Sequence, residues 1–268
     1  MRVLLLGGTG NLGSRCIPAF LAHEHIVTLY VRNPAKLQLL LSPAVLKKTT
    51  IVTGDATDSE GIKKAILAHN IEAVINVAGT QVKPGEEPLL PKIAKAVTDA
   101  AVAVRKERGI PLRAWLVSGL SILEYPGTPN SRLLQDYLPG FFYARVSAHE
   151  GTRKVVEAVR VSDLRWSLIC VAMMEPANPN QGLLELLDTP SHHNLVLQAK
   201  SPPAWKNTWL IWIPFVGMFL NFLVVVLGQY KTKYEDVADF LSEDLESGSE
   251  QWIGMRVGMK DKAKIKAS

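Results

Sequence analysis

The chain has 268 residues, 47% of them hydrophobic, which suits one α/β domain with a small appended lobe. The formal net charge is +5, but residues 260–268 hold four lysines against one aspartate and so supply +3 of it. The remaining body is close to neutral, which argues against a nucleic-acid-binding surface. The tail is either a solvated end or a weak contact with an anionic membrane.

In chain order, the first segment is an apolar run at residues 3–6 that breaks into glycines and becomes a helical pattern over 11–22. This pattern is typical of a buried strand that turns tightly into a helix. The glycines fit G-x-G-x-x-G at Gly8, Gly10 and Gly13, and G-x-x-G-x-x-G at Gly7, Gly10 and Gly13. Such glycines make the turn, let the backbone approach a pyrophosphate and let the helix pack close to the strand, while the helix N-terminus offers N–H groups to the phosphates. The predicted cofactor-binding residues of this turn are Gly7, Thr9, Gly10, Asn11, Leu12 and Gly13.

The next segments alternate apolar runs with helical patterns. Strands are predicted at residues 25–31, 50–52, 73–77, 113–117 and 166–173, and helices at 34–41, 58–68, 90–108 and 143–161. Asp58 is the expected N-cap of the second of these helices. Strands that are apolar on both faces and alternate with helices indicate a parallel sheet covered on both sides. The fold class is therefore predicted as α/β, a doubly wound Rossmann sheet that binds its ligand beyond the carboxyl ends of the strands.

The pattern changes after Glu175, where proline, asparagine and glycine become dense. We predict a dinucleotide-binding core over residues 1–175 and a C-terminal substrate lobe over 176–268. The lobe includes a closing helix at 234–245 and a last strand at 252–259, which return to the core.

Two cysteines, Cys16 and Cys170, lie far apart in the sequence, so we do not expect a disulfide framework. We expect a reducing, cytoplasmic compartment. A first strand that begins at residue 2 leaves no room for a signal peptide. No metal site is predicted, because two histidine pairs lack carboxylate or cysteine partners at ligand spacing. These pairs are His23 with His25 and His192 with His193.

The end of the second strand distinguishes NAD from NADP, since an acid there binds the ribose hydroxyl and a base accepts the 2′-phosphate. Arg32 stands where the acid would be, which favours NADP(H), although a solvated strand-end arginine would look the same. Asp55 either accepts from the adenine amino group or forms a turn. Further cofactor contacts are predicted at Ala56, Val77, Ala78 and Gly79.

Six segments resemble the atypical short-chain dehydrogenase/reductases, in particular the NmrA-like branch and fungal oxidoreductases of aromatic polyketide pathways. These segments are residues 7–13, 31–34, 54–55, 77–79, 162–167 and 234–240. The resemblance covers most of the chain and implies an NADP-binding Rossmann core with a C-terminal substrate lobe. That branch includes nucleotide-sensing regulators without turnover as well as reductases.

Typical short-chain dehydrogenases use a serine after the fifth strand and a Tyr-x-x-x-Lys whose lysine lowers the tyrosine pKa. Here Ser118 and Tyr143 match, but Ser147 stands in the lysine position and supplies no charge. His149, which shares a helical face with Arg153, is a candidate substitute because histidine titrates near neutral pH. The predicted catalytic residues are therefore Ser118, Tyr143 and His149. In the alternative, Tyr143 is a packed aromatic and His149 a surface or capping residue.

Residues 207–230 contain no charged residue, and 209–227 approach the length of about 20 residues that a membrane span needs. Pro214, Gly217 and Asn221 interrupt this stretch, and the helix that follows belongs to the same soluble fold, which argues against a span. The stretch is either a hydrophobic lid over an apolar substrate or a patch that buries in a homodimer or on a membrane surface. Predicted substrate contacts are Tyr125, Met173, Trp209, Trp212 and Phe215.

Together these features predict an NADP(H)-dependent oxidoreductase that passes a hydride between the nicotinamide and an apolar, aromatic, polyketide-like small molecule. The alternatives are a non-enzymatic NADP-sensing regulator, a redox-neutral isomerase or ring-opening enzyme, and a protein held on a membrane by residues 209–227.

Overall fold

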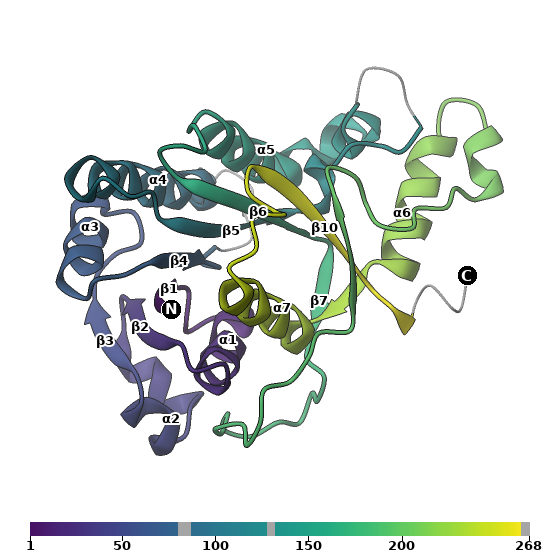
Figure 1. Cartoon of the computed structure of the whole chain (residues 1–268). Helices are drawn as coiled ribbons and strands as arrows, with labels where there is room; N and C mark the ends of the chain where they lie inside the picture. The colour runs from purple at the N-terminus through teal and green to yellow at the C-terminus, as the bar shows by residue number, and fades with distance from the viewer. Residues whose placement is uncertain (80–86, 128–131, 264–268) are drawn as a thin grey trace.

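A parallel sheet forms the centre of the molecule in the computed structural model, which describes residues 1–79, 87–127 and 132–263, apart from the side chains of Phe141, Tyr143, Ala144 and Arg145. The strands are β1 (Arg2–Leu6), β2 (Ile26–Val31), β3 (Thr50–Thr53), β4 (Ala73–Asn76), β5 (Arg113–Gly119), β6 (Arg165–Val171), β7 (Met173–Glu175), β8 (Leu195–Ala199), β9 (Lys231–Lys233) and β10 (Met255–Asp261). Within the described residues, eight strands form one sheet in the order β3-β2-β1-β4-β5-β6-β10-β8 (Figure 1). All neighbours are parallel except β8 and β10, and β7 pairs with β9 in a separate parallel ladder. The predicted doubly wound α/β fold is thus confirmed.

Helices cover both faces of this sheet. They are α1 (Asn11–Ala22), α2 (Pro43–Lys47), α3 (Ser59–Ala68), α4 (Leu89–Arg108), α5 (Tyr143–Glu157), α6 (Gly217–Gln229) and α7 (Tyr234–Ser247), with the short 3₁₀ turns η1 (Pro34–Leu39), η2 (Leu120–Ile122), η4 (Leu134–Tyr137), η5 (Gly140–Phe142) and η6 (Trp209–Trp212). Helices α3, α4 and α5 lie on one face, and α1 and α7 on the other (Figure 1). Asp58 accepts from the Gly61 amide at 3.0 Å and is the N-cap of α3, as predicted.

Alternation along the strands explains why both faces carry helices. In β1, Leu4 and Leu6 pack into the core on the α3–α4 side, whereas Val3 and Leu5 pack into the core on the α1–α7 side. Successive side chains of a strand point to opposite faces, so an entirely apolar strand requires cover on both.

The C-terminal region is shared between the core and a separate lobe. Helix α7 packs on α1, and β10 extends the sheet beyond β6, so this part of the C-terminal region lies against the core. The predicted strand at 166–173 is divided, because β6 ends at Val171 and Met173 begins β7, which pairs with β9. Helix α6 and η6 form a projection at one end of the molecule (Figure 1).

Candidate functional site

In the turn between β1 and α1, two glycines, Gly7 and Gly13, leave no space for a side chain. Gly7 has φ +90°, and a Cβ there would lie 2.6 Å from the Ala78 nitrogen. A Cβ on Gly13 would overlap the Gly7 carbonyl oxygen, which accepts from the Gly10 amide at 2.9 Å. The start of α1 is therefore held directly against the end of β1, as a dinucleotide-binding turn requires.

The helix begins without a capping side chain. Gly10 is the extended N-cap residue of α1, and no side chain accepts from the first turn. Since the first four amides of a helix have no intrahelical partner, the amides of Asn11, Leu12 and Gly13 form a positive end that suits a pyrophosphate.

A cavity of about 320 Å³ lies beside this turn, beyond the carboxyl ends of β1, β2, β3 and β4. Of the predicted cofactor residues, it is lined by Gly7, Thr9, Gly10, Arg32, Asp55, Ala56, Val77, Ala78 and Gly79. The structure therefore brings together residues from four separate strand ends, at the edge where parallel sheets bind ligands.

Further lining residues were not predicted from the sequence. They are Tyr30, Val31, Gly54, Thr57, Leu89 and Ile93. Tyr30 is 3% exposed, and its phenol occupies the space that a Cβ on Gly54 or Gly61 would take. Burial, followed by the charges of Asp58 and Asp55, raises the pKa of Tyr30, so this wall of the cavity is a neutral phenol.

Asp55 forms a turn in this structure. One of its oxygens, Oδ1, accepts from the Thr57 hydroxyl at 2.6 Å and from the Thr57 amide at 2.8 Å, and these bonds lower the pKa of Asp55. Its other oxygen lies 4.0 Å from the Arg32 guanidinium, whose side chain is 70% exposed. Arg32 thus stands at the mouth of the cavity with a positive charge that the solvent can reach.

Asn11 and Leu12 face away from this cavity. Leu12 is buried in the core, and the Asn11 side chain donates to the Tyr234 hydroxyl at 3.4 Å. The predicted cofactor role of Asn11 and Leu12 therefore rests on their backbone amides at the start of α1.

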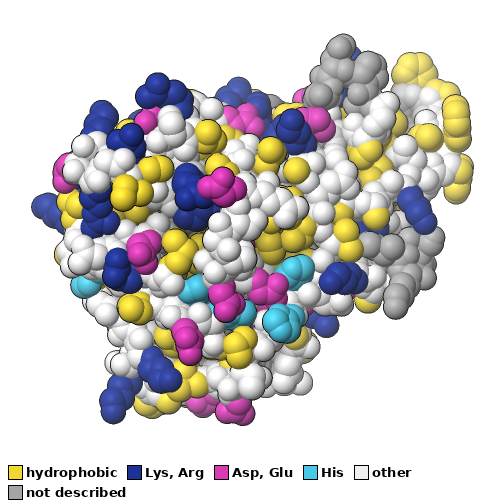
Figure 2. Space-filling view, viewed as in Figure 1, with side chains coloured by type: hydrophobic (Ala, Val, Ile, Leu, Met, Phe, Trp, Pro, Cys, Tyr) yellow, Lys and Arg dark blue, Asp and Glu magenta, His cyan; other side chains and the backbone are white. Residues whose placement is uncertain are grey.

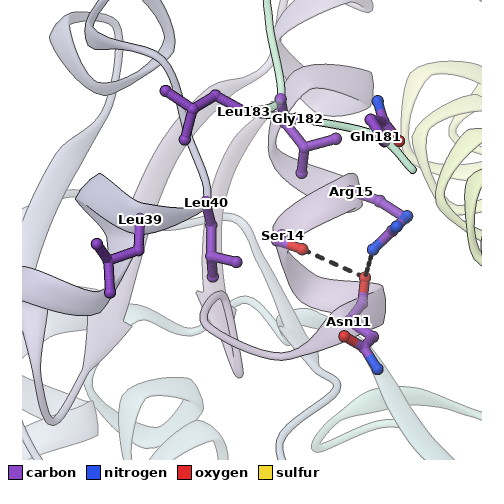
Figure 3. A pocket seen from close by; sticks show the side chains of 9 residues that line it. Asn11, Ser14, Arg15, Leu39, Leu40, Gln181, Gly182 and Leu183 are labelled. Carbon is purple, nitrogen blue, oxygen red and sulfur yellow. Dashed lines mark hydrogen bonds between the residues drawn. The ribbon is translucent and has the colours of Figure 1, made fainter. Parts of the chain in front are cut away.

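Asn11 instead borders a second cavity, of about 420 Å³, between α1, η1 and residues 181–184 (Figure 3). In Figure 3, the side chains of Ser14 and Arg15 converge on the backbone oxygen of Asn11. The Arg15 guanidinium also pairs with Glu235 at 2.5 Å, so its charge is already neutralised inside the protein.

Residues 7–195 match the profile of a protein family described as NAD(P)H-binding. The chain belongs to this NAD(P)H-binding family. The glycine turn, the uncapped start of α1 and the cavity beside them fit the cofactor that the family binds. No curated protein matches the sequence significantly.

Solved structures share the fold of this NAD(P)H-binding chain. A protein from Lactobacillus casei superposes with a TM-score of 0.68 at 15% identity, covering 97% of this chain and 99% of the other. A short-chain dehydrogenase/reductase from Veillonella parvula, solved in complex with NADP, superposes with a TM-score of 0.60 at 14% identity. The match covers 98% of this chain and 95% of the other. An oxidoreductase from Lactococcus lactis superposes with a TM-score of 0.59 at 13% identity, covering 100% of this chain and 96% of the other. The resemblance to fungal polyketide enzymes is not addressed by these matches and stays a prediction.

Two of the predicted catalytic residues of this NAD(P)H-binding protein lie together on the α4–α5 side of the sheet. Ser118, at the end of β5, is 2% exposed, and its Oγ has no hydrogen-bond partner among the described residues. The register pairs Asn76 with Leu116, so Ser118 lies two residues further toward the carboxyl edge, beside the strand that leads into Val77 and Ala78.

The ring of His149 packs against Gly119, where a Cβ would lie 2.6 Å from the His149 Cδ2 atom. Its Nδ1 is buried and unpartnered within the part of the chain that the structure describes, as is the Oγ of Ser121, a residue 6% exposed. Burial lowers the pKa of His149, so the imidazole is neutral at neutral pH and each ring nitrogen can serve as donor or acceptor. The Tyr143 side chain lies outside the described residues.

These unpartnered groups are available to a ligand. An unpaired polar atom inside a protein costs about 1–3 kcal/mol, and buried polar groups are ordinarily bonded. Ser118, Ser121 and His149 contribute two hydroxyls and a neutral imidazole near the carboxyl end of β5, groups that can bind a carbonyl or hydroxyl oxygen and exchange a proton with it.

The predicted substrate contacts are dispersed. Tyr125 is 4% exposed, and its hydroxyl bonds to Asn207 and Asn221 in an internal network. Met173 is half-buried in β7. The aromatic residues expected in a lid face solvent instead: Trp209 is 73% exposed, Trp212 82%, and Phe215 fully.

Proposed function

We propose that this protein is an NADP(H)-dependent oxidoreductase acting on an apolar, aromatic small molecule. The observation that carries the proposal is the set of buried, unpartnered polar atoms on Ser118, Ser121 and His149 at the carboxyl end of β5, the strand that follows β4 in the sheet. A nucleotide sensor needs the cavity alone, whereas an oxidoreductase also needs groups that hold a second ligand and manage its proton.

When bound, NADP(H) supplies or accepts the hydride. The chain provides the remaining functions. The glycine turn and the first amides of α1 hold the pyrophosphate, and the Arg32 guanidinium pairs with the 2′-phosphate. The Ser118 hydroxyl donates to the substrate oxygen. In the oxidative direction the neutral His149 ring takes the proton that leaves the substrate hydroxyl, and in the reductive direction His149, once protonated from solvent, gives that proton to the carbonyl oxygen as it is reduced. This division of roles replaces the missing lysine. A buried imidazole is uncharged near neutral pH without a neighbouring cation.

The choice of NADP over NAD is tested at Arg32. We expect Arg32→Ala to weaken NADPH binding about 10- to 100-fold, because it removes a charge-assisted contact worth about 1.5–3 kcal/mol. NADH binding should change little, since NADH has no 2′-phosphate. Titration of nicotinamide fluorescence with both cofactors measures the ratio. The matched control is Lys36→Ala, a nearby cation that does not line the cavity. Equal weakening of NADPH and NADH by Arg32→Ala would refute the assignment.

The catalytic assignment is tested at Ser118. We expect Ser118→Ala to lower kcat/KM about 100-fold for NADPH-dependent reduction of an anthraquinone, followed as loss of the nicotinamide absorbance. Its thermal stability should stay equal or rise, because the lost hydroxyl has no partner to leave behind. Ser242→Ala is the control: its Oγ is buried too, but it bonds to the Ala238 oxygen at 2.9 Å and lies on α7. That variant should lose some stability and no activity.

His149 gives a pH readout. Its folded pKa lies below the usual value, so the unfolded state binds the proton first and folding stability falls as the pH drops through about 6.5 toward the folded pKa. We expect His149→Gln to flatten this loss in denaturation curves and to lower kcat/KM about 100-fold at neutral pH. Full anthraquinone reduction by this variant would exclude His149 as the proton carrier. NADPH binding with no turnover of any tested quinone by the unaltered protein would favour the sensor.

A further inference from the structure

Helix α6 has its polar side inward. The residues it buries, Gly217, Asn221 and Val225, recur every four positions along one face. Asn221 is completely buried: its Nδ2 donates to the Tyr125 hydroxyl at 3.2 Å and to the Asn207 Oδ1 at 3.0 Å, and its Oδ1 accepts from the Thr208 amide at 2.7 Å. The polar group of this helix is thus used to attach it to the protein.

The outward face of α6 is apolar. Val224 is 52% exposed and Leu227 53%, on a helix that contains no charged residue. A surface helix of a water-facing protein shows the opposite arrangement, with its polar residues outside. The outer side of α6 is therefore suited to an apolar environment.

The turn before α6 adds aromatic side chains to the same projection, which we name the aromatic lobe (residues 205–230). Trp209 and Trp212 of η6 are 73% and 82% exposed, and Phe215 is fully exposed with φ +64°, a left-handed backbone that bulky residues rarely adopt. Figure 2 shows hydrophobic side chains gathered on this projection. Single exposed apolar residues are ordinary, but a group of them at the tip of a projection marks a contact site.

In the sequence, the charged residues that flank the aromatic lobe have one sign. The sequence has no aspartate or glutamate between Asp188 and Glu235, while it has Lys200, Lys206 and Lys233 there, besides Lys231. Lys206 and Lys233, at the two ends of the lobe, are exposed.

Two acids lie close to the lobe, and one of them is paired with a lysine. Glu175 pairs with Lys231 at 3.5 Å, and Asp136, in the η4 turn that packs on α6, accepts from the Leu133 amide at 2.9 Å. The lobe therefore has an apolar, aromatic tip, and the exposed lysines Lys206 and Lys233 lie where it joins the rest of the protein.

We propose that the aromatic lobe docks on the surface of an anionic lipid bilayer. The tryptophans, Phe215 and the outer face of α6 enter the boundary between headgroups and acyl chains, and the lysines contact the lipid phosphates. The contact is interfacial, because α6 has 13 residues and no described helix has the length and hydropathy to cross a bilayer. A narrow projecting tip suits insertion among lipids better than it suits a dimer, which typically buries about 800 Å² on each partner.

The test is flotation of the full chain with vesicles of phosphatidylcholine alone or with about 30% phosphatidylserine. We expect binding to the anionic vesicles, weakened by salt, and little binding to the neutral ones. The double variant Trp212→Ser/Phe215→Ser should bind on the order of tenfold less. The control Leu39→Ser/Ile110→Ser removes residues that are 77% and 72% exposed outside the lobe, and should bind normally.

NADPH affinity, measured in parallel, should be the same in the unaltered chain and both double variants if the substitutions leave the fold intact, since every substituted side chain is exposed. Absence of vesicle binding, or equal binding by the lobe variant, would overturn the proposal. Light scattering tests the alternative that the lobe binds a second copy of the chain. If the unaltered protein is a dimer, the lobe variant is a monomer and neither binds vesicles, the lobe is a dimer interface.

Discussion

A Gly13→Ala variant is expected to lose most of its affinity for NADPH and to unfold at a lower temperature. The added Cβ would overlap the Gly7 carbonyl oxygen and lie 3.0 Å from the Gly8 Cα, and both are backbone atoms that cannot rotate away. The start of α1 must therefore move from β1, which displaces the amides that face the pyrophosphate. Overpacking of this kind costs about 1–3 kcal/mol, and we expect NADPH affinity to fall at least about tenfold.

The control lies in the same turn. A Cβ on Gly8 would have Ile17 Cδ1 and Leu29 Cδ2 as its nearest neighbours, both at 3.6 Å, an ordinary contact with flexible side chains. Gly8→Ala should therefore bind NADPH and unfold nearly as the unaltered protein does. Fluorescence titration and thermal denaturation measure both variants. If Gly13→Ala and Gly8→Ala behaved alike, glycine at position 13 would not be required by the close helix–strand contact.

The cofactor half of the site could be predicted because its residues follow local rules. The glycine turn is one continuous segment, and Arg32, Asp55 and Val77 each come directly after a predicted strand, whose carboxyl end is fixed once the sheet is parallel. Leu89 and Ile93 could have been found by the same approach, since they are four residues apart at the start of α4 and so share its sheet-facing side.

The orientation of the aromatic lobe could not be predicted, because hydropathy does not show whether an apolar segment faces a ligand or the solvent. The run at 209–227 is apolar in sequence whether it closes over a ligand or faces solvent. Its orientation depends on Asn221, whose partners Tyr125 and Asn207 lie 96 and 14 residues away in the chain, and no spacing rule links those three residues. For the same reason Tyr125, which follows the fifth strand closely enough to suggest a pocket residue, belongs instead to this internal network.

The largest loss of stability is expected at a buried ion pair that ties α7 to the sheet. The Arg113 guanidinium and the Asp244 carboxylate are 3.0 Å apart, with side chains 7% and 2% exposed. The same Asp244 oxygen accepts from the Trp115 indole at 2.7 Å, and the guanidinium lies over that ring, 4.7 Å from its centre. Burial lowers the pKa of Arg113, and the nearby carboxylate opposes that shift, so the cation depends on this partner.

Asp244→Ala removes the partner and leaves the Arg113 charge inside the protein, so we expect the free energy of unfolding in urea to fall by about 3–5 kcal/mol. Glu250→Ala is the matched control: it breaks a 2.7 Å pair with Arg165, but those side chains are 79% and 34% exposed, and the loss should stay below about 1 kcal/mol. An Arg113→Met/Asp244→Leu variant should recover much of the lost stability, because an apolar pair leaves no unpaired charge. If Asp244→Ala were as stable as Glu250→Ala, water would have to reach the Arg113 guanidinium, and α7 would be held to the sheet by its apolar contacts alone.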